Sequence, residues 1–219
     1  MPRSPLLEKQ WALFEQQQYE EAFQMTQSAM SGLQGEDLRD AQRLMGLACY
    51  HKHQYERAVF WLMEACKGSA NAQDWLHLAL AAAMQGHQEL SAQAFEQVRL
   101  CQQAAKYAQE PGWYLQLYWY ACALCDSGQC ERALPLLNEL ASAYKRLRHS
   151  DTIYLRARDM PFLSSFLDLV VRCFRALARH AEGTAWLEEL AQALDPPGQR
   201  QVCQAIEEIW DMGNGKRKT

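Results

Sequence analysis

The chain has 219 residues, a formal net charge of −4 and only seven prolines, a composition typical of a helical protein. Because no basic stripe accompanies the negative charge, we expect no nucleic-acid partner. The longest apolar run, 75–84, is too short to span a bilayer, and residues 1–10 lack the pattern of a secretory signal. We therefore expect a soluble, cytoplasmic protein with no membrane partner.

Apolar residues recur three and four apart along most of the chain, which predicts amphipathic helices arranged in pairs. In chain order the expected pairs are 6–17 with a helix ending near 32, 41–50 with 55–66, a helix capped by Asn71 with 89–107, 113–125 with 131–148, and a helix opened by Asp159 and Pro161 with one ending before Asp195. We expect a loop at 32–37, and at 149–160 a loop or an extra turn.

Two features are expected at the carboxyl end. A final helix, 199–212, carries Val202, Ile206, Ile209 and Trp210 on one face, and it is expected to cap the last pair. The segment 213–219 is expected to be a disordered basic tail.

The stretch 41–66 predicts one compact antiparallel hairpin. Two apolar stripes flank the short polar link 51–54, so the second helix must fold back on the first. Small residues lie where the two helices would cross most closely, at Gly46, Cys49, Ala58 and Ala65. A hairpin of this size cannot bury both stripes alone, so we expect similar hairpins beside it.

A small residue recurs near the start of each expected second helix, and these residues mark an internal repeat. They are Ala22, Ala58, Ser91, Ala133 and Gly183. The first two intervals, 36 and 33 residues, match a repeat of about 34. The next two, 42 and 50 residues, predict insertions of one or two helical turns or a loop.

The central copy resembles a tetratricopeptide repeat. Its frame is filled by Met45, Gly46, Cys49, Tyr55, Ala58, Leu62 and Ala65, with Gln42 departing at the first bulky position. The resemblance implies an all-α, right-handed superhelical solenoid of about five helix pairs plus a capping helix. One domain, 1–212, is expected to hold all of it.

The resemblance also implies a concave groove lined by the first helix of each pair. The residues expected to contact a partner there are Leu7, Trp11, Phe14, Arg43, Leu47, Tyr50, Leu76, Leu80, Tyr118, Cys122, Arg172 and Arg175. We expect Tyr50 and Tyr118 to be the main anchors and the two C-terminal arginines to form a basic rim. Family members that bind chaperone peptides use a Lys and Asn clamp, which these positions lack.

Eight cysteines are scattered singly, and most are expected to be reduced packing residues. Cys122, Cys125 and Cys130 form C-x2-C-x4-C, but the sequence supplies no fourth ligand for a closed zinc site. No phosphate loop or catalytic motif occurs. We therefore expect no enzyme activity, no cofactor and no metal.

These observations favour a non-catalytic module that binds a peptide or helix of another protein, as a scaffold or adaptor. Membership of a larger complex is a further expectation. One alternative is a dedicated chaperone for a secreted or aggregation-prone client. Another, of a different class, is a thiol- or metal-dependent protein that uses Cys122, Cys125 and Cys130.

Overall fold

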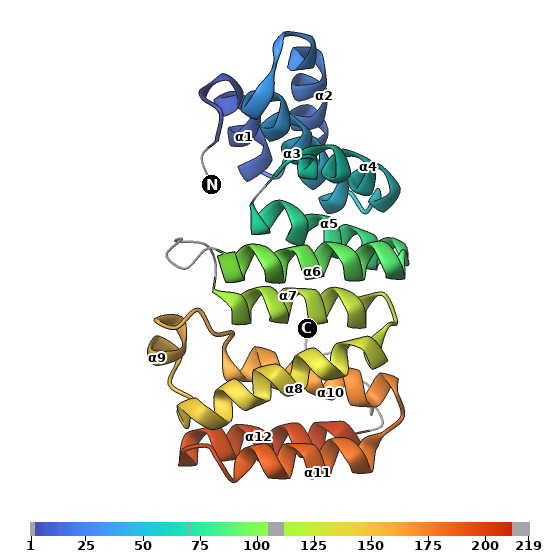
Figure 1. The fold of residues 1–219 in the computed structure, drawn as a ribbon. Helices are drawn as coiled ribbons and strands as arrows, with labels where there is room; N and C mark the ends of the chain where they lie inside the picture. Colours follow the sequence, from blue (N-terminus) through green and yellow to red (C-terminus); the bar gives the residue numbers. More distant parts are fainter. Residues whose placement is uncertain (1–2, 70, 105–111, 212–219) are drawn as a thin grey trace. The chain divides into compact units, whose positions relative to one another are not determined.

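The computed structural model describes residues 3–69, 71–104 and 112–211, and within these ranges the chain forms helices, turns and short links without a strand (Figure 1). The backbone contacts divide the chain into two compact units, 1–110 and 111–219. The single domain expected from the sequence stays a prediction. None of the described helices is long and apolar enough to cross a membrane.

The first unit contains six α-helices in its described part. They are α1 (Glu8–Glu15), α2 (Tyr19–Ala29), α3 (Gly35–His51), α4 (Tyr55–Cys66), α5 (Ala72–Gln85) and α6 (Gln88–Ala104), with two short 3-10 helices at Pro5–Leu7 and Met30–Gly32. Each α-helix packs against the next one along the chain. The pairs α1–α2, α3–α4 and α5–α6 are antiparallel hairpins, as the periodicity predicted.

The second unit contains α7 (Trp113–Asp126), α8 (Cys130–Leu147), α9 (Thr152–Arg156), α10 (Leu163–Ala176), α11 (His180–Ala191) and α12 (Pro196–Trp210). Helices α7 and α8 form one hairpin and α10 and α11 another. Helix α10 also contacts α7, α8 and α12. The described part of the chain therefore holds five hairpins, a short connecting helix and a final helix.

One turn geometry joins the helices of all five hairpins. In each turn a residue with positive φ follows the first helix: Gln17, His53, Gly86, Gly128 and Ala178. The next backbone N–H donates to the carbonyl five residues earlier, at 2.7–3.0 Å: Gln18 to Leu13, Gln54 to Cys49, His87 to Ala82, Gln129 to Leu124 and Arg179 to Phe174. This is the Schellman motif, which satisfies carbonyls left free at a helix end.

The small residues that mark the sequence repeat occupy one structural position. Each of them lies five residues after the positive-φ residue of its turn. All five are buried: Ala22, Ala58, Ser91, Ala133 and Gly183. The chain therefore repeats one hairpin five times, and the repeat read from the sequence is a repeat of structure.

The long intervals between the later copies arise in two ways. Helices α6 and α8 have 17 and 18 residues, whereas α2 and α4 have 11 and 12. Helix α9, which the Asp151 carboxylate caps by accepting from the backbone N–H of Tyr154, lies inside the segment 149–160. The predicted insertions are thus extra helical turns and one short helix.

Close approach in the central hairpin depends on Gly46. A Cβ added there would lie 2.6 Å from Cγ of Leu62, a separation that side-chain atoms do not tolerate. Ala58 and Ala65 on the facing helix are fully buried. The predicted crossing point of α3 and α4 is therefore confirmed.

Several predicted boundaries shift. Helix α3 begins at Gly35, inside the predicted loop 32–37, and α10 begins at Leu163 instead of at Pro161. The final helix begins at Pro196 instead of residue 199, because the Asp195 side chain accepts from the backbone N–H of Gly198 and caps it. The predicted ends at 107 and 212 and the basic tail lie outside the described residues.

The buried face of α12 also differs from the predicted one. Val202, Ala205 and Ile209 are buried, whereas Trp210 is 54% exposed and Ile206 is only partly buried. Helix α12 packs against α10 and α11, so its position agrees with a capping role. Trp210 contacts α11 at its edge, through a hydrogen bond from Nε1 to the Thr184 hydroxyl and a ring contact with His180. The predicted face is therefore confirmed in part: Val202 and Ile209 are its buried residues, and Trp210 lies at its exposed edge.

Candidate functional site

Four of the residues predicted to line a groove lie in the core of the first unit. Leu7 and Leu76 have no exposed surface, and Trp11 and Arg43 are each 6% exposed. Leu7 and Trp11 belong to a core cluster with Ala22, Ala41 and Leu44. In the described structure, these four side chains offer almost no surface to a partner, so their role is to stabilise the fold.

The other predicted groove residues of the first unit keep some exposed surface. They are Phe14, Leu47, Tyr50 and Leu80, all half-buried. Phe14 and Leu47 pack against the core cluster. The Tyr50 ring makes edge contacts with Tyr55 and His51, at centroid distances of 5.6 and 5.8 Å. Tyr50 therefore remains accessible as an anchor.

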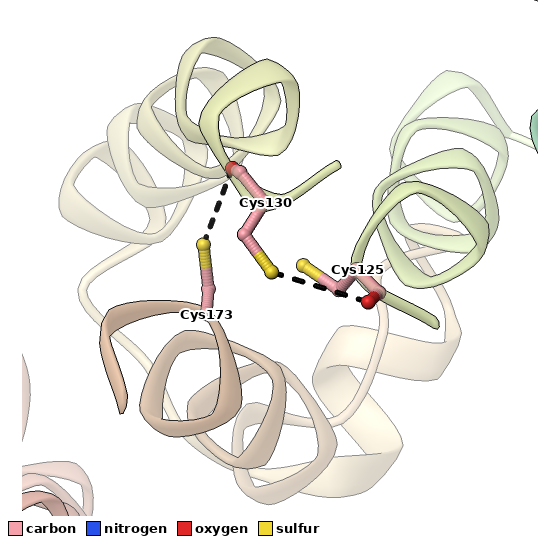
Figure 2. A group of neighbouring side chains, drawn as sticks. All are labelled: Cys125, Cys130 and Cys173. Carbon is pink, nitrogen blue, oxygen red and sulfur yellow. Dashed lines mark hydrogen bonds between the residues drawn. The ribbon is translucent and has the colours of Figure 1, made fainter. Parts of the chain in front are cut away.

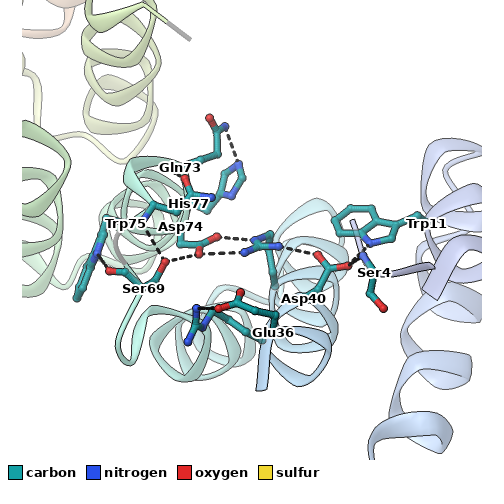
Figure 3. Close-up of polar contacts among 12 residues, drawn as sticks. Ser4, Trp11, Glu36, Asp40, Ser69, Gln73, Asp74, Trp75 and His77 are labelled. Atoms are coloured by element: carbon teal, nitrogen blue, oxygen red, sulfur yellow. Dashed lines mark hydrogen bonds and ion pairs between the residues drawn. The ribbon is translucent and has the colours of Figure 1, made fainter. Parts of the chain in front are cut away.

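Arg43 is the centre of a buried ion network with Asp40 and Asp74, the two carboxylates labelled in Figure 3. Its Nη1 donates to Oδ1 of Asp40 at 2.6 Å, and its Nε and Nη2 donate to the two carboxylate oxygens of Asp74 at 2.5 and 3.0 Å. Burial by itself lowers the pKa of Arg43, but the hydrogen bonds and charge of Asp74 outweigh it, so the pKa is raised. The Arg43 guanidinium therefore stays positively charged, and its pairing with Asp74 links α3 to α5.

Both carboxylates of the network receive further hydrogen bonds. Oδ2 of Asp40 accepts from the backbone N–H of Ser4 at 2.8 Å and from Nε1 of Trp11 at 2.9 Å. The Ser69 hydroxyl donates to Oδ2 of Asp74 at 2.7 Å. The network thereby attaches the N-terminal segment, α1 and the α4–α5 link to α3, which is a structural role.

The second unit holds a pocket beside a predicted anchor, Tyr118. Its volume is about 340 Å³, and its lining is Leu115, Tyr118, Trp119, Arg156, Asp159, Met160, Pro161, Phe162 and Ser165. Trp119 is 37% exposed and Phe162 is 44% exposed, so two aromatic side chains at this pocket reach solvent. Sequence reasoning missed the contribution of 156–162 because that segment carried no periodic signal.

Two tyrosine hydroxyls fix the wall of this pocket. The hydroxyl of Tyr118 donates to the Ser165 carbonyl at 3.3 Å, and that of the buried Tyr144 donates to the Pro161 carbonyl at 2.5 Å. Burial raises the pKa of Tyr118, and the neighbouring Cys122 raises it further. Tyr118 is therefore a neutral hydrogen-bond donor at physiological pH.

The two predicted rim arginines have partners within the second unit. Nη1 of Arg172 donates to Oδ1 of Asp126 at 2.6 Å, and Nη2 of Arg175 donates to the carbonyl of Asp211 at 3.0 Å. Both arginines are exposed. Their role as a rim that attracts an acidic segment stays a prediction.

Three cysteine sulfurs meet where α7, α8 and α10 converge (Figure 2). Cys125, Cys130 and Cys173 each contribute one Sγ, and the three sulfurs lie within 4.8 Å of one another. The Cys130 thiol donates to the carbonyl of Cys125 at 3.9 Å, and the Cys173 thiol donates to that of Cys130 at 3.4 Å. All eight cysteines of the chain are free thiols.

The cluster differs from the set that the sequence offered. Cys122 lies one turn before Cys125 and is not a member, and Cys173 takes its place from another helix. Burial raises the pKa of Cys130 to about 11, and it raises that of Cys122 to about 11. The hydrogen bond with Cys173, together with burial, raises the pKa of Cys125. Cys122, Cys125 and Cys130 are therefore protonated at neutral pH.

Comparison with known proteins adds no family to this description. No protein-family model matches the chain, and no curated protein matches it significantly. The fold itself defines the class of protein: within the described residues it is all-helical, with five hairpins that share one turn geometry. Its described sites are a buried ion network, an aromatic pocket and a cluster of three thiols.

Proposed function

We propose that the chain is a non-catalytic module that binds a short segment of another protein, and that its hairpins stack as in tetratricopeptide proteins. The observation that carries this proposal is the pocket beside Tyr118, with Trp119 and Phe162 at its solvent side. Exposed aromatic side chains around a pocket are characteristic of partner-binding surfaces, where a few large residues supply most of the affinity. We further propose that the protein acts as a scaffold in the cytoplasm.

The side chains that line the pocket indicate which kind of peptide would bind there. Leu115, Trp119 and Phe162 offer apolar surface, so a large apolar side chain of the partner fits there. Arg156 and Asp159 place one charge of each sign at the same pocket, and both are exposed. We therefore propose a peptide with one apolar anchor and a polar residue beside it.

The test is a selection from a random peptide library on the immobilised full-length chain, followed by titration of the selected peptides. Tyr118→Ala and Phe162→Ala are expected to weaken binding by about 1–3 kcal/mol, or roughly 5- to 150-fold. Phe60→Ala is the matched control, because Phe60 is 56% exposed in the first unit. Circular dichroism of each variant checks that the helices are retained.

The same titration distinguishes the other predicted contacts. A loss with Tyr50→Ala would extend the binding surface to the first unit, and a loss with the double Arg172→Ala, Arg175→Ala variant that fades at high salt would identify an electrostatic rim. Full-strength binding by folded Tyr118→Ala and Phe162→Ala, or a loss confined to Phe60→Ala, would contradict the assignment of the pocket.

A further inference from the structure

Three thiols that lie far apart in the sequence meet in one place in the second unit. Cys125 lies in the last turn of α7, Cys130 begins α8 and Cys173 lies in α10 (Figure 2). Cys130 and Cys173 are 43 residues apart, yet a thiol-to-carbonyl hydrogen bond joins them. Three packed helices therefore hold the sulfurs, which is the kind of support that gives a metal site a defined geometry.

We propose that Cys125, Cys130 and Cys173 bind one thiophilic divalent metal ion of the zinc class. Thiolate is the protein ligand that such ions prefer, and three protein ligands are enough for zinc when a water molecule completes the coordination. This site does not depend on the proposed peptide-binding function.

The spacing of the sulfurs suits a zinc ion. A zinc–sulfur distance of about 2.3 Å in a tetrahedron places the sulfurs about 3.8 Å apart. The three sulfurs already lie within 4.8 Å of one another. Closing the site therefore requires side-chain shifts of about 1 Å or less, which rotation about the Cα–Cβ bonds provides without moving the helices.

Charge favours a divalent ion over a monovalent one. Three thiolates with Zn²⁺ leave a net charge of −1, whereas three thiolates with Cu⁺ leave −2 in a mostly buried place. The positive charge of Arg172, next to Cys173, acts on both Cys125 and Cys130. Because Arg172 is already paired with Asp126, it offsets little of the charge of the site. Burial makes uncompensated charge costly, so the smaller net charge of −1 is the less costly one.

The fourth coordination position faces the Cys125 side. Cys130 and Cys173 are buried, whereas Cys125 is half-buried. No other His, Cys, Asp or Glu of the described residues joins the three sulfurs in a ligand group. We therefore assign the fourth position to water, which distinguishes this site from the closed four-ligand sites of structural zinc.

The test uses the reduced, full-length chain titrated with Zn²⁺ against a chromogenic chelator, and with Co²⁺ as a spectroscopic probe. The wild type is expected to bind one ion and to show the near-ultraviolet thiolate-to-cobalt absorption. Cys125→Ser, Cys130→Ser and Cys173→Ser are each expected to lose at least about tenfold in affinity, the lower bound for outer-shell changes. Cys203→Ser is the matched control, since Cys203 is exposed on α12.

Cys122→Ser separates this site from the C-x2-C-x4-C pattern of the sequence, and we expect it to bind like the wild type. If a cluster variant does not fold, the metal titration and the melting temperature of the wild type still test the proposal. Its melting temperature should rise with Zn²⁺ concentration, because an ion that binds only the folded state stabilises it. No Zn²⁺ binding by the wild type, binding of Cu⁺ alone, a cobalt spectrum without thiolate absorption, or equal loss in Cys203→Ser would overturn the proposal.

Discussion

Replacing Arg43 by methionine is expected to destabilise the protein by about 3–5 kcal/mol. The substitution keeps much of the side-chain volume and leaves Asp40 and Asp74 buried without their cation. Breaking a buried pair from one side is costly because the remaining charge has lost its compensation. The change in the free energy of unfolding in urea, read by far-ultraviolet circular dichroism, measures the effect.

Arg39→Met is the matched control for this experiment. Arg39 lies on the same helix, one turn earlier, and pairs with Glu36, whose side chain is 80% exposed. Exposed pairs of this kind contribute about 0–1 kcal/mol. If Arg43→Met cost no more than Arg39→Met, the ion network would not organise the first unit.

Removing α12 by truncation before Pro196 is expected to make the protein aggregate. The helix buries Val202, Ala205 and Ile209 against α10 and α11, and its loss exposes the apolar faces of both. Contact with α11 is close, since a Cβ added at Gly183 would lie 3.0 Å from Cδ1 of Ile209. Terminal caps with a polar outer face keep helical-repeat proteins soluble.

A point variant measures the same contact in a full-length chain. Ile209→Asp places an unpaired carboxylate in a fully buried position, and we expect a loss of several kcal/mol. Cys203→Ser on the same helix is exposed and should change stability by less than about 0.5 kcal/mol. Light scattering and melting temperature report both variants. A truncated chain that stays monomeric and as stable as the wild type would show that α12 is no cap.

The hairpins could be predicted from the sequence because their signal is local. Small residues recur five positions after each turn, and apolar stripes recur every three or four residues. At Gly86 and Gly128 the residue type itself indicates a turn, since glycine adopts positive φ without strain. Gln17, His53 and Ala178 occupy the same position without that signal, so the equivalence of all five turns appears only in the structure.

The sites were harder to predict because they join residues distant in sequence. Arg43 and Asp74 are 31 residues apart, and nothing local marks a buried arginine as part of a network. The resemblance placed Arg43 and Leu76 in a groove, but packing between successive hairpins buries them. Cys173 likewise joins Cys125 and Cys130 only because α10 folds against α7 and α8.

One hairpin with one turn geometry occurs five times in the described residues, and nuclear magnetic resonance of the turns in solution tests this repetition most directly. Residual dipolar couplings and backbone chemical shifts give φ at residues 17, 53, 86, 128 and 178. We predict positive φ at all five, and slow hydrogen exchange for the amide that follows each one, which donates the Schellman hydrogen bond. Negative φ at His53 or Ala178, with rapid exchange of the next amide, would contradict the account.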